Sequence, residues 1–460
     1  MHNKWTNLLI MLGCILLLSA PFPYSGKNAT AALTAEIIGT IVLFIIAHTQ
    51  IHRGKLSKPV RYFIAYGLIL TIIYLIPLPT SIWEQLPGRT AYVDLSTWLE
   101  KNYDIFVYKS LSVNYLHTLS FALGIIPALA LFLTTLSIPV SSLRILVYAF
   151  LLSAAGQAVL AILQYYTQNP SLFSGIQSMA ARGSYLNQNH LTAYMEIAEP
   201  IALAFVLYYV IRQTDTRAVQ KTLKIAIFSL LSMTLLFIPL ISTSRMGLFL
   251  LLLSIILSFW TMTPSTIRSK IILPLISLRL LLLGVFITLH YTFVTNTATT
   301  VMRAAPQNIA GDLRWTMWKN TWEGILALAP FGSGPGTFQQ GFRPFQSIEN
   351  NLFINHAHND YLEFMFETGV LGVVLILYFA YLYGWQWRQI KLIHEKSLMR
   401  LLQSGAGVGI FLFMVYSLTE FNFHTPANVM YFCFLLGIFF RQPDTNNQLN
   451  SPPAKADGFS

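Results

Sequence analysis

The sequence predicts an all-α polytopic membrane protein with about twelve transmembrane helices, each of roughly 17–25 residues. Three observations support this fold class. Hydrophobic residues make up 55% of the chain and charged residues only 10%, whereas soluble domains contain about 25% charged residues. Apolar runs long enough to cross a bilayer recur from one end of the chain to the other. Lysines and arginines alternate between successive loops, as the positive-inside rule requires.

The apolar runs give the expected helices in order. Their bounds are residues 5–23, 31–48, 60–76, 118–136, 139–163, 190–211, 225–242, 246–262, 271–288, 368–386, 404–420 and 428–440. With this count and a cytoplasmic N-terminus, the short basic loops all fall on the cytoplasmic side. The net charge of +11 therefore reflects orientation in the membrane, and nucleic acid is not an expected partner.

The loops divide the expected architecture into four parts. Residues 1–288 hold the first nine helices, with periplasmic loops at 77–117 and 164–189, and residues 289–367 form a large periplasmic loop between helices 9 and 10. Residues 368–440 hold the last three helices. The Asn-, Pro- and Ser-rich residues 441–460 are expected to be a disordered cytoplasmic tail. Because the long loops face outward, function is expected on the outer face.

The most informative segment is the octet 356–363 (HAHNDYLE), where the large loop meets the apolar run 370–383. A neutral imidazole at His358 or His356 can accept a proton from a hydroxyl group near neutral pH. The His-x-His pair could also bind a metal, but Asp360 and His424 are only loose candidates for further ligands, so we expect no metal and no cofactor. Asp360 and Glu363 are expected either to orient His358 or to cap the following helix, and Asn359 is expected to support the same site.

Arginines on the expected outer side are candidates for binding an anion. Arg245 stands in the tight turn 242–247 (STSRMG), with snorkelling to lipid headgroups as the alternative. Arg314 begins a tryptophan-rich stretch, 313–328, whose apolar residues recur every three or four positions and predict a helix near the membrane surface. Because guanidinium groups bind phosphate through two N–H donors, several converging arginines indicate a diphosphate ligand.

A third outward segment, residues 182–190, precedes an expected span. Arg182 could bind an anion, and Asn187 and Asn189 are expected to cap and orient the helix that carries His190. Below His190, Glu196 and Glu199 share one helix face and could be proton-relay groups or polar contacts between helices. The glycine-rich stretch 330–338 is predicted to be a turn joining two helices, although its backbone N–H groups could also bind an anion.

These residues resemble the O-antigen ligase and polymerase superfamily of bacterial membrane glycosyltransferases. The resemblance is carried by residues 332–338, by 358–363 and by 367–372 (ETGVLG). It extends upstream to Arg314 with Trp318, to residues 242–245 and to residues 183–190. It therefore covers most of the chain, from about Arg182 onward.

The resemblance implies a GT-C-like fold in the bacterial inner membrane, with the active site on the periplasmic face. The donor would be a glycan on undecaprenyl diphosphate, which the ligases transfer to the lipid A core without a metal ion. Matched residue by residue, His358 would activate the acceptor hydroxyl, and Arg245 and Arg314 would bind the diphosphate. His356 is additional to the commoner pattern, so the sequence leaves open which histidine is the base.

Several functional alternatives stay open at this level. Lipid A core is the favoured acceptor, because no extracytoplasmic domain beyond the loops is evident, but another carrier-linked glycan would make the protein a polymerase and a protein hydroxyl an oligosaccharyltransferase. A transporter for glycans is an alternative of another class, with Glu36, Glu196, Glu199 and Arg279 along its path. A non-catalytic scaffold would need neither His358 nor the arginines. Membrane lipid is an expected partner in every case.

Overall fold

The computed structural model describes residues 2–49, 56–167, 181–211, 218–242, 244–263, 313–346, 353–392 and 397–442, together with residues 169 and 284. Throughout these ranges the protein is helical, and its only β-type pairing is an isolated bridge between Pro77 and Ser110. Each predicted apolar run in these ranges coincides with a helix. The run predicted at 271–288 and Arg279 lie outside the described residues, except for Gly284.

The helices that match the predicted runs are α1 (His2–Ser19), α2 (Ala29–Thr49), α3 (Lys58–Ile73), α6 (Tyr115–Ser137), α7 (Val140–Thr167), α8 (Gln188–Ile211), α9 (Ala218–Ile241), α10 (Arg245–Met262), α16 (Asp360–Leu392), α17 (Leu398–Tyr416) and α18 (Pro426–Phe439). Among the described helices, eight are long and apolar enough to cross a membrane, namely α2, α6 to α10, α16 and α17. The chain is thus a multi-pass membrane protein.

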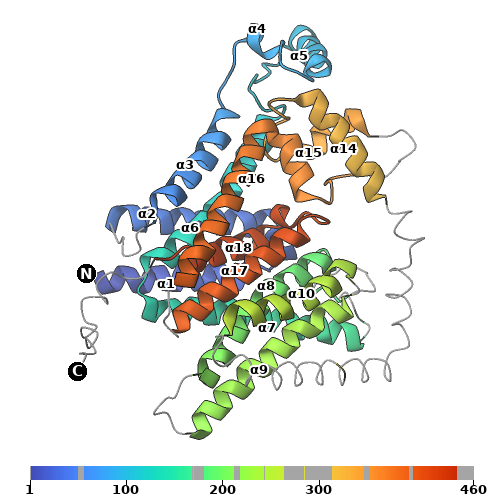
Figure 1. The fold of residues 1–460 in the computed structure, drawn as a ribbon. Coiled ribbons are helices and arrows are strands. Elements are labelled where there is room, and N and C mark those ends of the chain that lie inside the picture. Colours follow the sequence, from blue (N-terminus) through green and yellow to red (C-terminus); the bar gives the residue numbers. More distant parts are fainter. Residues whose placement is uncertain are drawn as a thin grey trace, which may run out of the picture.

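The connections between these helices contain shorter elements: α4 (Thr80–Trp83), α5 (Thr90–Tyr103), α14 (Arg314–Leu328), α15 (Phe338–Gly341) and the 3₁₀ turns η1 (Tyr24–Gly26), η2 (Arg343–Phe345) and η3 (Asn422–His424). The helix predicted at 313–328 is confirmed as α14. Figure 1 shows α4, α5, α14 and α15 gathered at one end of the helical body. Loops that are far apart in the sequence therefore meet at that end.

Helix α8 forms the centre of the body and is buried over almost its whole length. It packs closely against α17, because a Cβ atom on Gly405 of α17 would lie 2.7 Å from the carbonyl oxygen of Pro200. Small residues at such crossings let helix backbones approach each other in a membrane. Glu199 of α8 accepts hydrogen bonds from Ser232 of α9 (2.8 Å) and Ser254 of α10 (3.1 Å). This carboxylate therefore joins neighbouring helices, as the polar-contact interpretation expected.

The glycine-rich stretch 330–338 is a turn that follows α14 and is hydrogen-bonded to α16. Its backbone N–H groups bond within the protein: Ser333 donates to Phe366 O (3.1 Å), Gly334 to Glu367 O (2.7 Å) and Phe338 to Glu367 Oε1 (2.9 Å). Gly334 has a φ of 111°, and a Cβ atom there would collide with the Ser112 side chain. Since these N–H groups already have acceptors, the turn does not offer them to an anionic ligand.

Candidate active site

The histidine loop, residues 353–359, lies where α16 begins. Asn359 caps α16, because its Oδ1 accepts the backbone N–H groups of Tyr361 (3.0 Å) and Leu362 (3.1 Å). His358, immediately before this cap, has a φ of 49°, in the left-handed region. Such a backbone costs roughly 1–2 kcal/mol for a residue with a side chain. The loop therefore holds His358 in a position that local preference alone would not select.

The His358 ring is oriented by a buried carboxylate. Its Nδ1 lies 3.2 Å from Oε2 of Glu420, whose side chain is only 2% exposed, whereas the His358 side chain is 28% exposed. A carboxylate at Nδ1 favours the proton on that nitrogen and leaves the lone pair on Nε2. Nε2 has no hydrogen-bond partner among the described residues. His358 therefore presents a basic nitrogen on its free side.

Glu420 joins segments that are distant in the sequence. Its Oε1 accepts from Arg314 Nη2 of α14 at 2.5 Å and from Asn189 Nδ2 of α8 at 2.6 Å. The expectation that Asn189 caps α8 is wrong, because this amide reaches Glu420 instead. Asn187 is the cap, since its Oδ1 accepts the N–H of Asn189 at 2.9 Å.

Sequence reasoning missed Glu420. The sequence does carry a signal, because this acid is the last residue of the apolar run 404–420, near Asn422 and His424. Ionisable residues at such a boundary are candidates for function by default.

His356 belongs to a second, deeper network. Its Nδ1 lies 2.8 Å from Glu363 Oε1, and Glu363 Oε2 accepts the backbone N–H of Ala357 at 2.7 Å. His424 of η3 bonds through Nδ1 to Asp360 (3.1 Å), and its Nε2 lies 3.3 Å from Glu363. Asp360 and Glu363 therefore hold His424 and His356, and neither orients His358.

The two inner histidines differ in charge. Burial lowers the pKa of His356, although Glu363 opposes that effect. Burial would also lower the pKa of His424, but Glu363, Asp360 and Glu367 outweigh it and raise that pKa to about 10. His424 is therefore an imidazolium at neutral pH, and His356 is neutral.

Three potential metal ligands meet in this network, since His356, Glu363 and His424 each bring one ligand atom within 4.8 Å of the others. Metal binding was not expected from the sequence. The hydrogen bonds of these three residues affect whether they could bind a cation. Glu363 Oε1 is already bonded to His356, and an imidazolium has no lone pair to offer a cation. A metal ion would have to displace both a proton and a hydrogen bond, so we interpret these three residues as a structural network.

Arg314 pairs with Glu420, and Arg245 begins a helix that is bonded to the segment before Glu420. The Arg314 side chain is 24% exposed, so it can reach a ligand while it pairs with Glu420. Arg245 is the first residue of α10, and the preceding Ser244 caps this helix and bonds to the Tyr416 hydroxyl at 2.5 Å. Tyr416 ends α17, four positions before Glu420. The α10 terminus that carries Arg245 is thus attached directly to the segment leading to Glu420.

Arg182 and His190 are positioned by other contacts. Gln164 of α7 accepts the Arg182 backbone N–H at 3.1 Å, and burial lowers the pKa of the Arg182 guanidinium. These contacts tie Arg182 to α7 rather than to Glu420. His190 is buried, with its Nδ1 2.9 Å from Thr425 Oγ1 and its ring edge-on to Phe421. It packs behind the histidine loop.

Tryptophans of α14 lie next to the histidine loop. Trp318 of α14 donates from Nε1 to the carbonyl of Ala357 at 3.0 Å, and Trp315 packs edge-on against it. Trp315 and Trp322 are themselves about half exposed. Helix α14 thus supplies both Arg314 and an apolar cover next to His358.

Residues 229–377 match the sequence model of the O-antigen ligase family. The resemblance expected from the motifs is confirmed over this stretch, which is narrower than the expected region from Arg182 onward. It includes Arg245, Arg314 and the octet 356–363, but not Glu420. No curated protein sequence matches the chain. Members of the matched family are glycosyltransferases of the ligase and polymerase type.

Proposed function

We propose that this protein is a glycosyltransferase of the O-antigen ligase type, acting at the periplasmic face of the bacterial inner membrane. It moves a glycan from undecaprenyl diphosphate to an acceptor hydroxyl. The observation that carries the proposal is the chain of contacts from Arg314 through Glu420 to His358, in which a guanidinium and an imidazole share one carboxylate. The match of residues 229–377 to the O-antigen ligase family supports it.

His358 acts as the general base in this proposal. Nε2 takes the proton of the acceptor hydroxyl while that oxygen forms a bond to the anomeric carbon of the donor sugar. The bond between this carbon and the diphosphate oxygen breaks, and undecaprenyl diphosphate leaves with the electron pair. Glu420 stabilises the imidazolium that forms and fixes its orientation, as the carboxylate does in Ser-His-Asp enzymes.

The arginines stabilise the departing diphosphate. Arg314 and Arg245 provide planar donors that can pair with phosphate oxygens, and charge stabilisation of this kind is often the largest single contribution to catalysis. Arg182 is the third candidate for the same task. The proposed step therefore uses protein side chains alone and no cofactor. The fold class proposed is GT-C-like.

Water is a competing acceptor, because hydrolysis would release the glycan unused. Trp318 of α14 contacts the histidine loop, and an apolar cover at this place would keep water from an activated sugar. A donor held by a long lipid suits a site at the end of membrane helices. Lipid A core is the proposed acceptor, with polymerisation and protein glycosylation as outcomes of the same chemistry.

The test is product analysis in a strain deleted for the protein and complemented with wild type, Arg245→Ala or the control Arg61→Ala. Arg61 is an exposed residue of α3 and removes the same charge away from the candidate site. Lipid A core, free polymer and glycoprotein are measured separately at matched membrane expression. Wild type and Arg61→Ala should restore one product and Arg245→Ala should not. Full restoration of the product by Arg245→Ala would contradict the proposed binding of the diphosphate by Arg245. If wild type restores no product, the proposal of glycan transfer is contradicted.

A further inference from the structure

A lysine from the other end of the chain reaches the candidate site. Lys27 follows η1, in the connection between α1 and α2, and its Nζ lies over the ring of Phe421, 5.1 Å from the centroid. The same ring stacks on His356 at 4.2 Å and meets His358 edge-on at 4.7 Å. Lys27 is therefore separated from the proposed base by a single aromatic ring, and it lies outside the residues that match the family.

The backbone before Lys27 is held in a costly conformation. Tyr24, Ser25 and Gly26 have φ values of 53°, 57° and 80°, so two residues with side chains stand in the left-handed region. Strain of about 1–3 kcal/mol per residue persists only where surrounding structure imposes it. Here Ser25 is fully buried, and Gly26 packs so closely on Pro426 that a Cβ atom would lie 3.2 Å from it. The fold thus fixes the point from which the Lys27 side chain extends.

The Lys27 ammonium is not neutralised by an ion pair with a described residue. Among the described residues it forms no hydrogen bond and no ion pair within 4.0 Å. Burial lowers its pKa, and the nearby carboxylates of Glu363 and Asp360 oppose that effect. Those carboxylates are already engaged by His356 and His424. Because its acidic neighbours already bond to histidines, this half-buried ammonium can bind an anionic group of a ligand.

The order of contacts indicates which part of the substrate meets Lys27. Arg314 bonds to Oε1 of Glu420 and His358 contacts Oε2, while Lys27 lies beyond Phe421. The contacts therefore run from Arg314 through Glu420 to His358, and from His358 through Phe421 to Lys27. In an in-line displacement the hydroxyl attacks the anomeric carbon on the side opposite to the departing diphosphate. If the arginines bind the diphosphate, the lysine is on the acceptor side.

We propose that Lys27 binds an anionic group, a phosphate or a carboxylate, carried by the acceptor close to the hydroxyl that reacts. The proposal rests on the proposed function and adds a charge requirement for the acceptor. Lys27 would then discriminate anionic acceptors from neutral ones, whereas Arg245 and Arg314 serve every donor.

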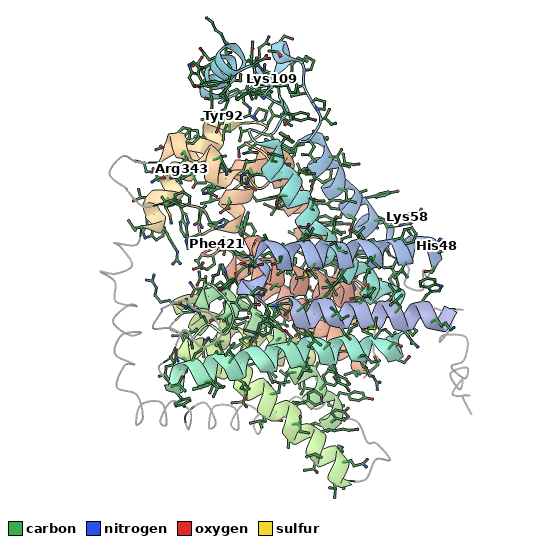
Figure 2. All side chains as sticks on the ribbon, turned by 180° about the vertical axis from the view of Figure 1, so that it is seen from behind. His48, Lys58, Tyr92, Lys109, Arg343 and Phe421 are labelled. Atoms are coloured by element: carbon green, nitrogen blue, oxygen red, sulfur yellow. The ribbon has the colours of Figure 1, made fainter. Side chains whose placement is uncertain are left out.

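Lys109 offers a matched control, because its Nζ also lies over an aromatic ring, 5.9 Å from the centroid of Trp83, and it pairs with Glu100 at 3.0 Å. Figure 2 shows Lys109 near the top of the view, well apart from Phe421. Lys109→Gln removes one lysine and one ring contact without touching the histidine network.

The test measures initial rates of glycan transfer by purified wild type, Lys27→Gln, Lys27→Arg and Lys109→Gln in phosphatidylglycerol-containing nanodiscs. Each protein receives one acceptor glycan with a phosphate group and the same glycan after phosphatase treatment, with donor and acceptor concentrations varied separately. Lys27→Gln should raise the KM for the phosphorylated acceptor about 10- to 100-fold, the range for a lost bond to a charged group. The KM for the donor and for the neutral acceptor should not change, and Lys27→Arg should retain most of the preference.

Three results would overturn the assignment. Equal kcat/KM of wild type for the two acceptors would do so without any variant, even if Lys27→Gln failed to fold. A rise in donor KM would assign Lys27 to the diphosphate. An equal loss of activity with both acceptors would assign Lys27 to structure or to lipid headgroups. Wild type that transfers no glycan to either acceptor would contradict the proposed function itself.

Discussion

Replacing Glu420 by glutamine should remove most of the transfer activity while leaving the fold in place. The change is isosteric, and the amide oxygen can still accept from Arg314 and Asn189, which lie 2.5 and 2.6 Å from Oε1. The amide NH₂ group then faces Nδ1 of His358, where Oε2 now stands at 3.2 Å. A donor at that position stabilises the tautomer with its proton on Nε2, which cannot act as a base.

The two effects differ in size. A charge-assisted hydrogen bond is worth about 1.5–3 kcal/mol and a neutral one about 0.5–1.5 kcal/mol, so losing the charge beside Arg314 should cost about 1–2 kcal/mol of stability. General base catalysis contributes roughly 10²–10⁴-fold in rate, and a wrong histidine tautomer costs about 10⁴-fold in Ser-His-Asp enzymes. We therefore expect transfer to fall by about 10²–10⁴-fold with a modest loss of thermal stability.

The assay measures transfer from undecaprenyl-diphosphate-linked glycan by purified protein, with unfolding temperature measured on the same samples. Glu84→Gln is the control, because Glu84 is an exposed carboxylate of the α4 region. If folded Glu420→Gln protein transfers glycan at the wild-type rate, Glu420 does not set the tautomer of His358.

Three further outcomes follow from the same structure. Arg314→Lys keeps the charge but loses the planar donor fork, so the KM for the donor should rise about tenfold in the transfer assay, and an unchanged KM would argue against a bidentate contact. His424 has a pKa raised to about 10 from an ordinary 6.5, so its stabilising contribution is complete below pH 6.5 and is lost as the pH rises towards 10. The unfolding temperature of wild type should therefore fall more steeply over this range than that of His424→Gln, and parallel curves would contradict the charged state. Gly334→Ala places a Cβ atom against Ser112 at a φ of 111° and should cost about 1–3 kcal/mol, whereas Gly67→Ala, with open space around it, should be neutral or slightly stabilising in the same thermal assay.

Much of the fold follows from local pattern. Apolar runs of spanning length predicted each membrane helix in the described ranges, because burial in lipid requires continuous hydrophobicity and internal hydrogen bonding. The three-to-four spacing of apolar residues after Arg314 likewise predicted α14. Those signals depend only on neighbouring residues, so a single sequence carries them.

The site was harder to predict, because its contacts join segments far apart in the chain. The octet 356–363 pointed to the histidines, but the partner that orients His358 stands at position 420, after another helix. Asn189 was expected to cap α8 because it stands before the apolar run. Its side-chain amide donates a hydrogen bond to Glu420 instead. Lys27 gave no sequence signal, since a single lysine between two apolar helices has the composition of an ordinary loop.

In the proposed mechanism His358, and not His356, takes the proton from the acceptor. The most direct measurement is the rate of glycan transfer by purified wild type, His358→Ala, His356→Ala and His117→Ala. His117 is a histidine of α6 whose side chain pairs with Gln340 among the described residues. His358→Ala should lose at least about 100-fold in rate, His356→Ala should retain measurable transfer if folded, and His117→Ala should match wild type. A folded His358→Ala protein that transfers glycan at the wild-type rate would contradict the mechanism.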